Sequence, residues 1–484
     1  MSSSITAADR HETTLSDSLL QNIPGNYGNP FFGPIVDRYK YYYIQGEVEF
    51  FKSRMKKYQS TVFRCNMPPG PFMARNPRVI CLLDALSFQT LFDNSKVEKK
   101  NVLDGTFMPS TEFTGGYRVC AFLDPSEPNH AVLKGLFLSV LAKKHDTFIP
   151  IYRQALSTMF SGLEEEFSTK GSAYFNDLSD RMSFEFVFRF FCDKHPSETP
   201  IGSDGPKLVD LWLLGQLHPL MTLGLKYFPN FLEDLLLHTF PLPFCLVKSK
   251  YKKLYDAFYS SACSILDEAE KVGLKRDEAC HNLVFLAGFN AYGGMKTLFP
   301  ALIKWVGAAG EDLHRRLRDE IRDVVKAEGG VTVAALNKMK LTKSTLYEAL
   351  RIEPPVPYQY GKAKQDLTVQ NHESSFLIKK GEMLFGYQPI VTKDPIIFKN
   401  PEEFVADRFV GAGEELIQYV YWSNGRETEE PTTENKQCPG KDIVIMLSRL
   451  MLVEFFLRYD TIQVESGKLL AGSWVTIKSF TKAT

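Results

Sequence analysis

The sequence has no excess of charge of either sign and no long hydrophobic run at its start. Its 484 residues include 57 Lys and Arg against 57 Asp and Glu, which argues against a nucleic-acid partner. Residues 1–21 contain no apolar stretch near the ~20 residues that a membrane span needs. Asp9, Glu12 and Asp17 interrupt this Ser- and Thr-rich segment, whereas plastid transit peptides are poor in acids. We therefore expect a disordered cap over residues 1–21 on an unanchored protein, either cytoplasmic or peripherally associated with a membrane or lipid bodies.

The cysteines lack the close pairing typical of a disulfide framework. Eight are spread along the chain without Cys-x-x-Cys spacing, so reduced thiols are expected. Cys438 differs from the rest, because it lies in Lys-Gln-Cys-Pro-Gly-Lys, residues 436–441, just before an apolar run over 443–457. A helix N-terminus and flanking lysines would stabilise a thiolate there. Cys438 is therefore a candidate metal ligand, with a buried structural cysteine as the alternative.

Two segments upstream favour the metal-ligand interpretation. Glu348 and Arg351 are three positions apart, on one face of a predicted helix that ends at the proline-rich residues 354–357. Residues 400–409, Asn-Pro-Glu-Glu-Phe-Val-Ala-Asp-Arg-Phe, offer a second arginine. Each feature alone is typical of a surface ion pair. In this order before a Cys-x-Gly helix start, they resemble the C-terminal half of a cytochrome P450, which implies haem b with its iron bound to the Cys438 thiolate.

The loop before this cysteine departs from the usual P450 pattern, Phe-x-x-Gly-x-x-x-Cys-x-Gly. Gly425 precedes Cys438 by thirteen positions rather than four, and Trp422 stands where the phenylalanine is expected. Either the iron site is unusual or the match is accidental. The helix on the opposite side of a P450 haem distinguishes these two cases.

A buried helix is predicted over residues 282–299. A monooxygenase carries an acid–alcohol pair here to deliver protons to bound oxygen, whereas Phe-Asn-Ala-Tyr-Gly-Gly, residues 289–294, has neither beyond a tyrosine. A haem protein without this relay is not expected to activate O₂, but it can use a substrate that already contains an O–O bond. Gly293 and Gly294 share a helical face with Asn290 and leave open surface for haem and substrate. A packing glycine pair with a satisfied core asparagine is the alternative.

With these features the sequence resembles the plant cytochromes P450 that metabolise fatty acid hydroperoxides, namely allene oxide synthases, hydroperoxide lyases and divinyl ether synthases. The resemblance is carried by residues 23–28, 66–72, 114–118, 124–128 and 353–357, by the lengthened loop 422–440 and by the Phe-Asn-x-x-Gly-Gly helix. It reaches the C-terminus and leaves out only the first ~20 residues. The family implies a polyunsaturated fatty acid hydroperoxide as both oxidant and substrate, with no O₂, NADPH or redox partner.

The resemblance implies a single-domain P450 fold over residues 22–484, mainly α with small β-sheets (α+β). Helical patterns cover 130–170, 250–325 and 440–457, and strand-like alternation covers 61–83, 376–386 and 475–481. No internal repeat or long linker divides the chain. The apolar residues 212–246 are either a lipid-facing entrance or packed core. An oligomer is compatible with the sequence.

Haem binding requires partners for two propionates, whose negative charge enters a largely apolar cavity. His130 and Lys134 are four positions apart at the start of a helix opened by Pro128, so both can address one anion. In the family, the equivalents of these two residues, of Lys99 and of Lys436 contact the haem. For the latter two, an exposed surface lysine is the alternative.

The family also assigns residues to the substrate and the product. Asn290 is suited to hydrogen-bond the peroxide oxygen during O–O cleavage, and the equivalent of Lys296 contributes to the substrate site. Six positions separate the two, which does not place them on one ideal helical face. Allene oxide synthases generally have a phenylalanine at the position of Leu103, whose ring favours a developing carbocation. Leu103 and the helix segment 288–294 together resemble the non-plastid hydroperoxide lyases instead, which accept 9-hydroperoxides and often 13-hydroperoxides.

The leading expectation is therefore a fatty acid hydroperoxide lyase of oxylipin biosynthesis, with Asn290 and Leu103 as catalytic residues. It would cleave 9-hydroperoxides, 13-hydroperoxides or both, of linoleic or linolenic acid, into aldehydes and ω-oxo acids through a hemiacetal. Allene oxide synthase and divinyl ether synthase are the alternatives within the family. A catalytically idle, lipid-associated haem protein would not consume hydroperoxide, and a monooxygenase would depend on NADPH and a reductase.

Overall fold

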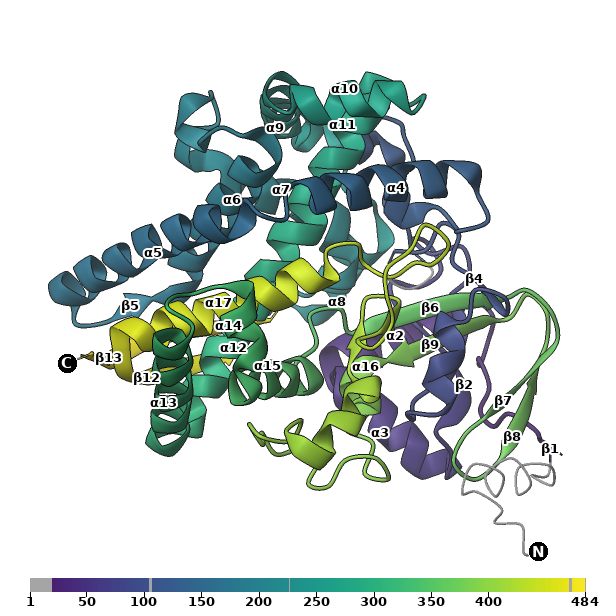
Figure 1. Cartoon of the computed structure of the whole chain (residues 1–484). Helices are drawn as coiled ribbons and strands as arrows, with labels where there is room; N and C mark the ends of the chain where they lie inside the picture. The colour runs from purple at the N-terminus through teal and green to yellow at the C-terminus, as the bar shows by residue number, and fades with distance from the viewer. Residues whose placement is uncertain (1–19, 104–106, 226, 470–471, 484) are drawn as a thin grey trace, which may run out of the picture.

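Helices dominate the chain in a computed structural model that describes residues 20–103, 107–225, 227–469 and 472–483 (Figure 1). The α-helices are α2 (Phe32–Tyr39), α3 (Glu47–Tyr58), α4 (Pro128–Lys143), α5 (Phe148–Lys170), α6 (Phe175–Cys192), α7 (Gly205–Leu217), α8 (Asn230–Thr239), α9 (Lys248–Ser261), α10 (Cys263–Lys271), α11 (Arg276–Val284), α12 (Gly293–Ala309), α13 (Glu311–Ala327), α14 (Val333–Lys338), α15 (Lys340–Ile352), α16 (Gln388–Val391) and α17 (Lys441–Arg458). Further helical segments include the 3-10 helices η2 (Ser87–Phe92) and η10 (Gly411–Tyr419) and the π-helix η9 (Phe285–Tyr292).

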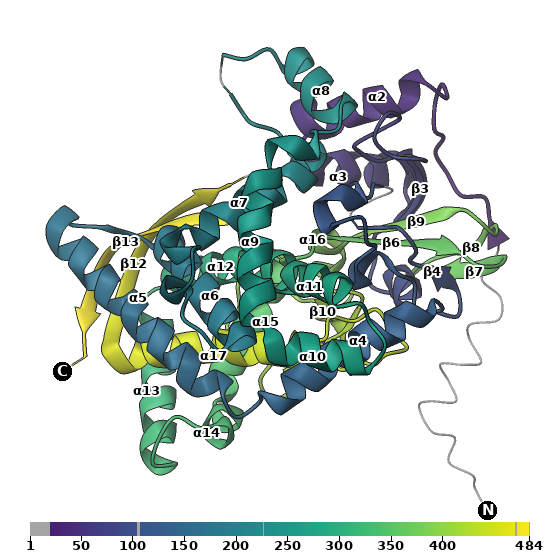
Figure 2. The ribbon, with the colours of Figure 1, turned by 90° about the horizontal axis from the view of Figure 1, so that it is seen from above.

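The strands form small separate sheets at opposite sides of the helices. They are β1 (Leu20–Gln21), β2 (Val62–Asn66), β3 (Arg78–Leu82), β4 (Val97–Glu98), β5 (Ala173–Tyr174), β6 (Tyr358–Ala363), β7 (Leu367–Gln370), β8 (Ser375–Ile378), β9 (Met383–Tyr387), β10 (Tyr421–Trp422), β11 (Gly425–Arg426), β12 (Tyr459–Lys468) and β13 (Ser473–Lys482). The largest sheet has the order β2-β3-β9-β6-β4, with β3 parallel to β9, and β1-β8-β7 lies beside it. The sheet β12-β13-β5 lies at the other end of the molecule (Figures 1 and 2).

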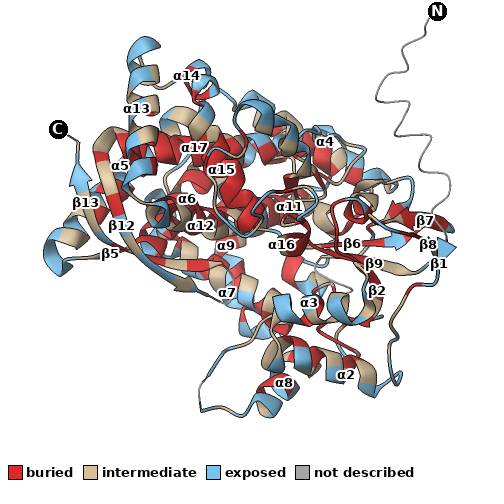
Figure 3. Ribbon diagram, turned by 90° about the horizontal axis from the view of Figure 1, so that it is seen from below, coloured by how far each residue is buried: buried red, intermediate tan, exposed pale blue. Residues whose placement is uncertain are grey.

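Helices α6, α12, α15 and α17 form the buried centre (Figure 3). One apolar cluster joins them, whereas two smaller clusters pack on the large sheet. Leu346 and Leu350 of α15 and Leu450 and Met451 of α17 are at most 1% exposed, as helical spacing of apolar residues requires for helices that cross a core. The packing of α15 against α17 brings the two ends of the segment 353–440 close together.

Glu348 of α15 neutralises two buried arginines at this centre. Arg351 donates to it through Nε and Nη2 at 2.7 and 2.8 Å, and Nε of Arg408 lies 3.0 Å from both carboxylate oxygens. Glu348 and Arg351 are 0% exposed. The guanidiniums also donate to backbone carbonyls of residues 392, 399–401 and 403, and Val405 N donates to Glu348. The carboxylate therefore fixes the segment that leads toward Cys438.

The predicted mainly α architecture with small sheets is confirmed, although its boundaries shift. The long helical stretches are broken, 130–170 into α4 and α5 and 250–325 into α9–α13 with η9. Of the predicted N-terminal cap, residues 1–19 lie outside the described residues, whereas Leu20 and Gln21 already pair in parallel with Ser375 and Phe376. Among the described residues, no helix combines the length and apolar character needed to cross a bilayer.

All eight cysteines are free, in agreement with the expected reduced state. The sequence did not reveal that Cys65 of β2 and Cys81 of β3 lie with their Sγ atoms 3.3 Å apart. Both are buried between adjacent antiparallel strands.

We predict that Glu348→Gln lowers the free energy of unfolding by about 3–5 kcal/mol, because two guanidiniums stay buried without their carboxylate. Urea unfolding measures this change. Asp312→Asn, which removes an exposed carboxylate 2.6 Å from Arg315, should cost less than about 1 kcal/mol. Equal losses in the two variants would refute a central role for Glu348.

Candidate active site

Cys438 lies at the end of a folded loop, just before α17. Its backbone N–H donates to the carbonyl of Ser423 at 3.2 Å, which ties it to the β10–β11 hairpin. Burial raises the pKa of the thiol, whereas the backbone N–H of Gly440 and the charge of Lys134 lower it. The indole N–H of Trp422 also lowers this pKa through its proximity to the sulfur. Its geometry falls short of a hydrogen bond, and Nε1 has no other partner among the described residues. A half-buried cysteine with a backbone N–H and a lysine that lower its thiol pKa suits a thiolate that binds a metal cation.

The lengthened loop is packed rather than loose, so the insertion noted in the sequence does not argue against an iron site. The side chain of Gln437 is 1% exposed and donates to the carbonyl of Arg426 at 2.6 Å. A Cβ at Gly425 would lie 2.8 Å from that side chain, so a larger residue at 425 would displace Gln437 from its hydrogen bond. Nζ of Lys441 donates to the carbonyl of Glu427 at 2.8 Å. These contacts hold the loop against the start of α17.

Four cationic side chains predicted to hold haem converge on the same loop. Lys99, His130 and Lys134 are at most 3% exposed, and Lys436 is half-buried. His130 Nδ1 lies 3.1 Å from the carbonyl of Thr433, and Lys134 donates to the carbonyl and the side chain of the neighbouring residue 435. Figure 1 shows the loop beside α4, which carries both residues. Their convergence from distant segments argues against the surface-lysine alternative.

The three lysines of this cluster have no carboxylate partner within the described part of the chain. Nζ of Lys99 binds amide oxygens of Asn424 and Gln359 at 2.6 and 3.4 Å, and Nζ of Lys436 binds three carbonyls at 2.8–3.1 Å. Asn424 and Gln359 are site residues that the sequence did not reveal. The local sequence around a polar residue in a turn or strand does not indicate which distant residue it will contact.

The lowered pKa values of these four side chains indicate a cluster of basic groups without a paired carboxylate among the described residues. Burial, with the charge of Lys436, lowers the pKa of Lys99 to about 7, and burial lowers those of Lys134 and Lys436 to about 8. Burial and the two neighbouring lysines lower the pKa of His130 to about 4. A bound anion would favour the charged forms. Two propionates beside an iron-binding thiolate are the anions that this arrangement fits, so the residues present suit haem b.

The helix across from Cys438 differs from its predicted form. The sequence predicted one regular helix over 282–299, but α11 ends at Val284 and the π-helix η9 intervenes before α12. The N–H of Gly293 reaches the carbonyl of Gly288, five residues earlier. Such wide turns are frequent at functional sites.

Asn290 lies in this π-helix and is exposed, although Ala287 and Tyr292 are 0% exposed. A Cβ at Gly294 would meet no atom within 4 Å, and one at Gly293 would find its nearest neighbour at 3.6 Å. The open space beside Gly294 agrees with a surface for a planar ring, whereas Gly293 packs at ordinary distance against its neighbours. The exposure of Asn290 argues against a satisfied core asparagine.

Lys296 is bound to two acids. Its ammonium group pairs with Asp180 of α6 and, at 3.1 Å, with Asp210 of α7. Tyr292 also donates to Asp210, at 3.2 Å. These charges raise the pKa of Lys296 against the effect of burial, which by itself would lower it. The predicted contact of Lys296 with substrate stays a prediction, and the two aspartates are partners that the sequence reasoning did not identify.

Leu103 is half-buried against the main apolar cluster, beside residues 104–106, which lie outside the described residues. Its catalytic role also stays a prediction. The apolar segment 212–246 is divided, because Trp212 is 0% exposed while Phe231, Leu236 and Leu246 are 56–65% exposed. Its proposed contact with lipid is likewise not tested by these exposures.

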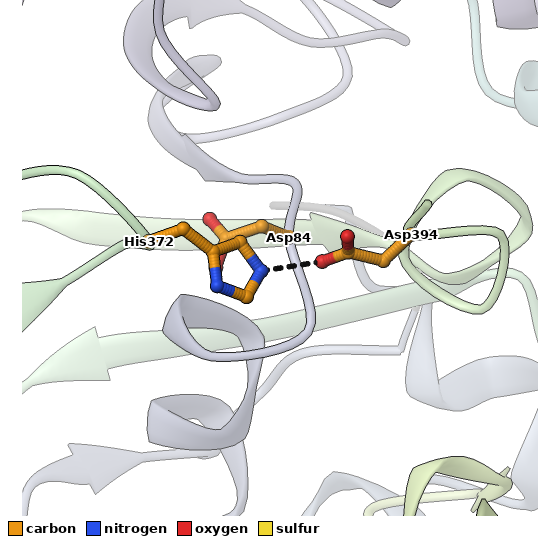
Figure 4. A group of neighbouring side chains, drawn as sticks. All are labelled: Asp84, His372 and Asp394. Atoms are coloured by element: carbon orange, nitrogen blue, oxygen red, sulfur yellow. Dashed lines mark hydrogen bonds and ion pairs between the residues drawn. The ribbon is translucent and has the colours of Figure 1, made fainter. Parts of the chain in front are cut away.

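Asp84, His372 and Asp394 form the one group of metal-capable side chains that the described residues bring together (Figure 4). His372 Nε2 lies 2.7 Å from Asp394, which also accepts from the backbone of Ala85 at 2.9 Å. Asp84 accepts from two backbone N–H groups and from the hydroxyls of Thr61 and Ser87. These bonds use the carboxylate oxygens to cap η2, so the group stabilises structure.

Comparison with known proteins decides the family. The cytochrome P450 family model matches residues 308–468, in which Cys438 is the only cysteine. Allene oxide synthase 3 of Solanum lycopersicum is 60% identical over 99% of this chain and 98% of its own length. This chain belongs to the cytochromes P450 that metabolise fatty acid hydroperoxides. Allene oxide synthase 1, chloroplastic, of Solanum lycopersicum is 54% identical over 96% of this chain and 87% of its own length, and 9-divinyl ether synthase of Capsicum annuum is 52% identical over 96% and 98%.

Membership of the family confirms two expectations. The cofactor is haem b with a cysteine thiolate on the iron. The enzyme acts on fatty acid hydroperoxides without a redox partner.

Two other expectations need correction. The predicted location outside the plastid is contradicted, because a relative that covers 96% of the chain is named chloroplastic. The acids at positions 9, 12 and 17 were too little evidence against plastid targeting. The predicted hydroperoxide lyase activity is also unsupported, because these relatives are named for allene oxide and divinyl ether synthesis. A single residue, Leu103, is weaker evidence for the reaction than 60% identity to an allene oxide synthase over 99% of the chain.

We predict that Lys99→Met releases haem faster, because a charge-assisted hydrogen bond contributes about 1.5–3 kcal/mol. Haem transfer to apomyoglobin should accelerate by roughly 10–100-fold. The adjacent Lys100 is 44% exposed and 3.7 Å from Glu127, so Lys100→Met is the matched control and should change the rate little. Identical transfer rates for the two variants would exclude Lys99 from haem binding.

Proposed function

We propose that the protein is an allene oxide synthase, which dehydrates polyunsaturated fatty acid hydroperoxides to unstable allene oxides. The observation that carries this proposal is the 60% identity to allene oxide synthase 3 over 99% of the chain. The distal helix supports peroxide chemistry, because residues 289–294 include no carboxylate and the hydroxyl of Tyr292 binds Asp210. A site of this kind lacks the proton relay for O₂ activation.

Each site residue has a separate task in this proposal. Cys438 binds the iron, and Lys99, His130, Lys134 and Lys436 hold the propionates. Haem, when bound by these residues, would supply the iron for homolytic cleavage of the peroxide O–O bond. The carboxamide of Asn290 donates a hydrogen bond to a peroxide oxygen and orients it in the open space beside Gly294.

Divinyl ether synthesis is the second candidate, because a 9-divinyl ether synthase is 52% identical over 96% of the chain. The two activities lose a proton from different carbons of the same rearranged substrate. Product identity therefore separates them, whereas hydroperoxide consumption does not.

We predict that the purified haem protein converts linoleic acid 9- or 13-hydroperoxide mainly to ketols, the hydrolysis products of allene oxide, under argon and without NADPH. Gas chromatography with mass spectrometry identifies the products. Divinyl ethers as the main product would support the second candidate. Short aldehydes with ω-oxo acids would show instead that the protein is a hydroperoxide lyase.

We predict that Asn290→Ala lowers kcat about tenfold or more, because a hydrogen bond worth ~1.4 kcal/mol in the transition state changes the rate tenfold. The decay of hydroperoxide absorbance measures turnover, and an unchanged Soret spectrum shows that haem is retained. Asn129→Ala removes an exposed carboxamide of α4 and should keep full activity. Full activity in Asn290→Ala would remove Asn290 from the mechanism.

A further inference from the structure

Trp422 stands where the usual P450 loop has a phenylalanine. Both side chains fill apolar space, but only the indole carries a hydrogen-bond donor, its Nε1–H. The ring of Trp422 is 7% exposed and belongs to the main apolar cluster, against which Cys438 packs. The tryptophan therefore adds one polar group to an apolar environment next to the cysteine.

The backbone holds this indole beside the sulfur. Trp422 is the last residue of β10 and pairs with Gly425 of β11, so it leads directly into the turn of the hairpin. The next residue, Ser423, accepts the backbone N–H of Cys438 at 3.2 Å. The indole N–H lies close enough to the sulfur to lower the pKa of the thiol. The hairpin thus approaches Cys438 through its backbone and through the indole.

The indole donor of Trp422 is buried and has no hydrogen-bond partner among the described residues. The indoles of Trp212 and Trp305, by contrast, donate to the carbonyl of Phe113 at 2.9 Å and to Glu353 at 3.1 Å. A buried donor without a partner costs free energy, because it has lost its hydrogen bonds to water. A neutral thiol is a weak acceptor, whereas a hydrogen bond to an anion is a strong one. The donor is therefore better satisfied by a thiolate than by a thiol.

We propose that the indole N–H of Trp422 donates a hydrogen bond to the Cys438 thiolate when haem is bound, and that it withdraws electron density from the sulfur. Hydrogen bonds to a metal ligand are one means by which a protein sets the reduction potential of the metal. Trp422 would act through the sulfur, as a residue that tunes the ligand.

The electron density on the sulfur bears on how a peroxide is cleaved. An electron-rich thiolate favours heterolysis, which leaves both electrons of the O–O bond on one oxygen, whereas homolysis leaves one electron on each. A thiolate weakened as a donor by Trp422 suits homolysis. This link rests on the proposed function, whereas the effect on the reduction potential does not.

Trp422→Phe restores the usual residue and removes the N–H donor. In the purified haem-loaded protein the midpoint potential of the iron should become more negative, because a thiolate without this hydrogen bond stabilises ferric iron. With carbon monoxide on the reduced haem, the C–O stretching frequency should fall, because more electron density reaches the antibonding orbitals of the ligand. Trp474→Phe changes a half-buried tryptophan of β13 and is the matched control, which should leave both values unchanged. Parental values in Trp422→Phe would overturn the proposal.

A second measurement varies the donor and keeps the ring, because lost packing can also change a potential. Protein made with 5-fluorotryptophan has more acidic indole N–H groups, and its potential should be more positive than that of the unlabelled protein. The same labelling of Trp422→Phe leaves three indoles elsewhere in the chain and should give no shift. Equal shifts in both proteins would refute a hydrogen bond from Trp422. If Trp422→Phe does not retain haem, the labelled parent protein still decides, since the absence of a positive shift in it overturns the proposal.

Cumene hydroperoxide tests the link to homolysis separately. Homolysis gives an alkoxyl radical that loses a methyl radical to form acetophenone, whereas heterolysis gives an alkoxide that gains a proton to form 2-phenyl-2-propanol. The ratio of acetophenone to the alcohol should fall at least twofold in Trp422→Phe. A more negative potential with an unchanged ratio would support the hydrogen bond and refute its link to homolysis. If the parent protein makes no ketols from linoleic acid hydroperoxides, the proposed function fails, while the potentials still decide the hydrogen bond.

Discussion

The carboxylate of Glu348 is the interaction on which the position of the metal site depends. It stands between two guanidiniums in a region that excludes water, where each charge would otherwise be costly. The other N–H groups of Arg351 and Arg408 donate to backbone carbonyls of residues 392–403. The carboxylate therefore fixes the position of this backbone segment as well as neutralising the two arginines. That backbone precedes the hairpin β10–β11, whose turn accepts the N–H of Cys438. The buried carboxylate of Glu348 thus helps to position the backbone before Cys438, which lies ninety residues further along the chain.

The three lysines of the haem-binding cluster, unlike the arginines around Glu348, have no carboxylate partner among the described residues. Lys99, Lys134 and Lys436 bind only neutral oxygens, and burial lowers the pKa of each. Lys296, by contrast, is neutralised by two aspartates. This difference fits the proposed role of the three lysines, because a carboxylate supplied by the chain would compete with haem propionates. A cluster left uncompensated in this way makes cofactor binding contribute to stability, since the anion is favoured only in the folded protein.

The sequence was informative where function depends on local spacing and uninformative where it depends on distant packing. Glu348 with Arg351, and His130 with Lys134, are helical neighbours, so their shared faces could be predicted. The partners of Lys296 are 116 and 86 residues away and left no local trace. The π-helix at residues 285–292 was missed because its apolar residues equally suit an α-helix. The expectation of a lyase rested largely on one residue, Leu103, whereas the relatives named as allene oxide and divinyl ether synthases match 96% or more of the chain.

The neutrality of Asn290 is consistent with the proposed use of a P450 scaffold for a peroxide substrate. A carboxamide donates a hydrogen bond without titrating, so it can orient an O–O bond but cannot supply the protons that reductive O₂ activation consumes. The nearest titratable groups on the same helix are held elsewhere, since Tyr292 and Lys296 both bind Asp210. In the proposed function the distal side would therefore position the peroxide rather than supply acid catalysis. Allene oxide and divinyl ether synthesis would then differ in which carbon of the rearranged substrate loses a proton, a choice that one hydrogen bond from Asn290 to the peroxide does not make.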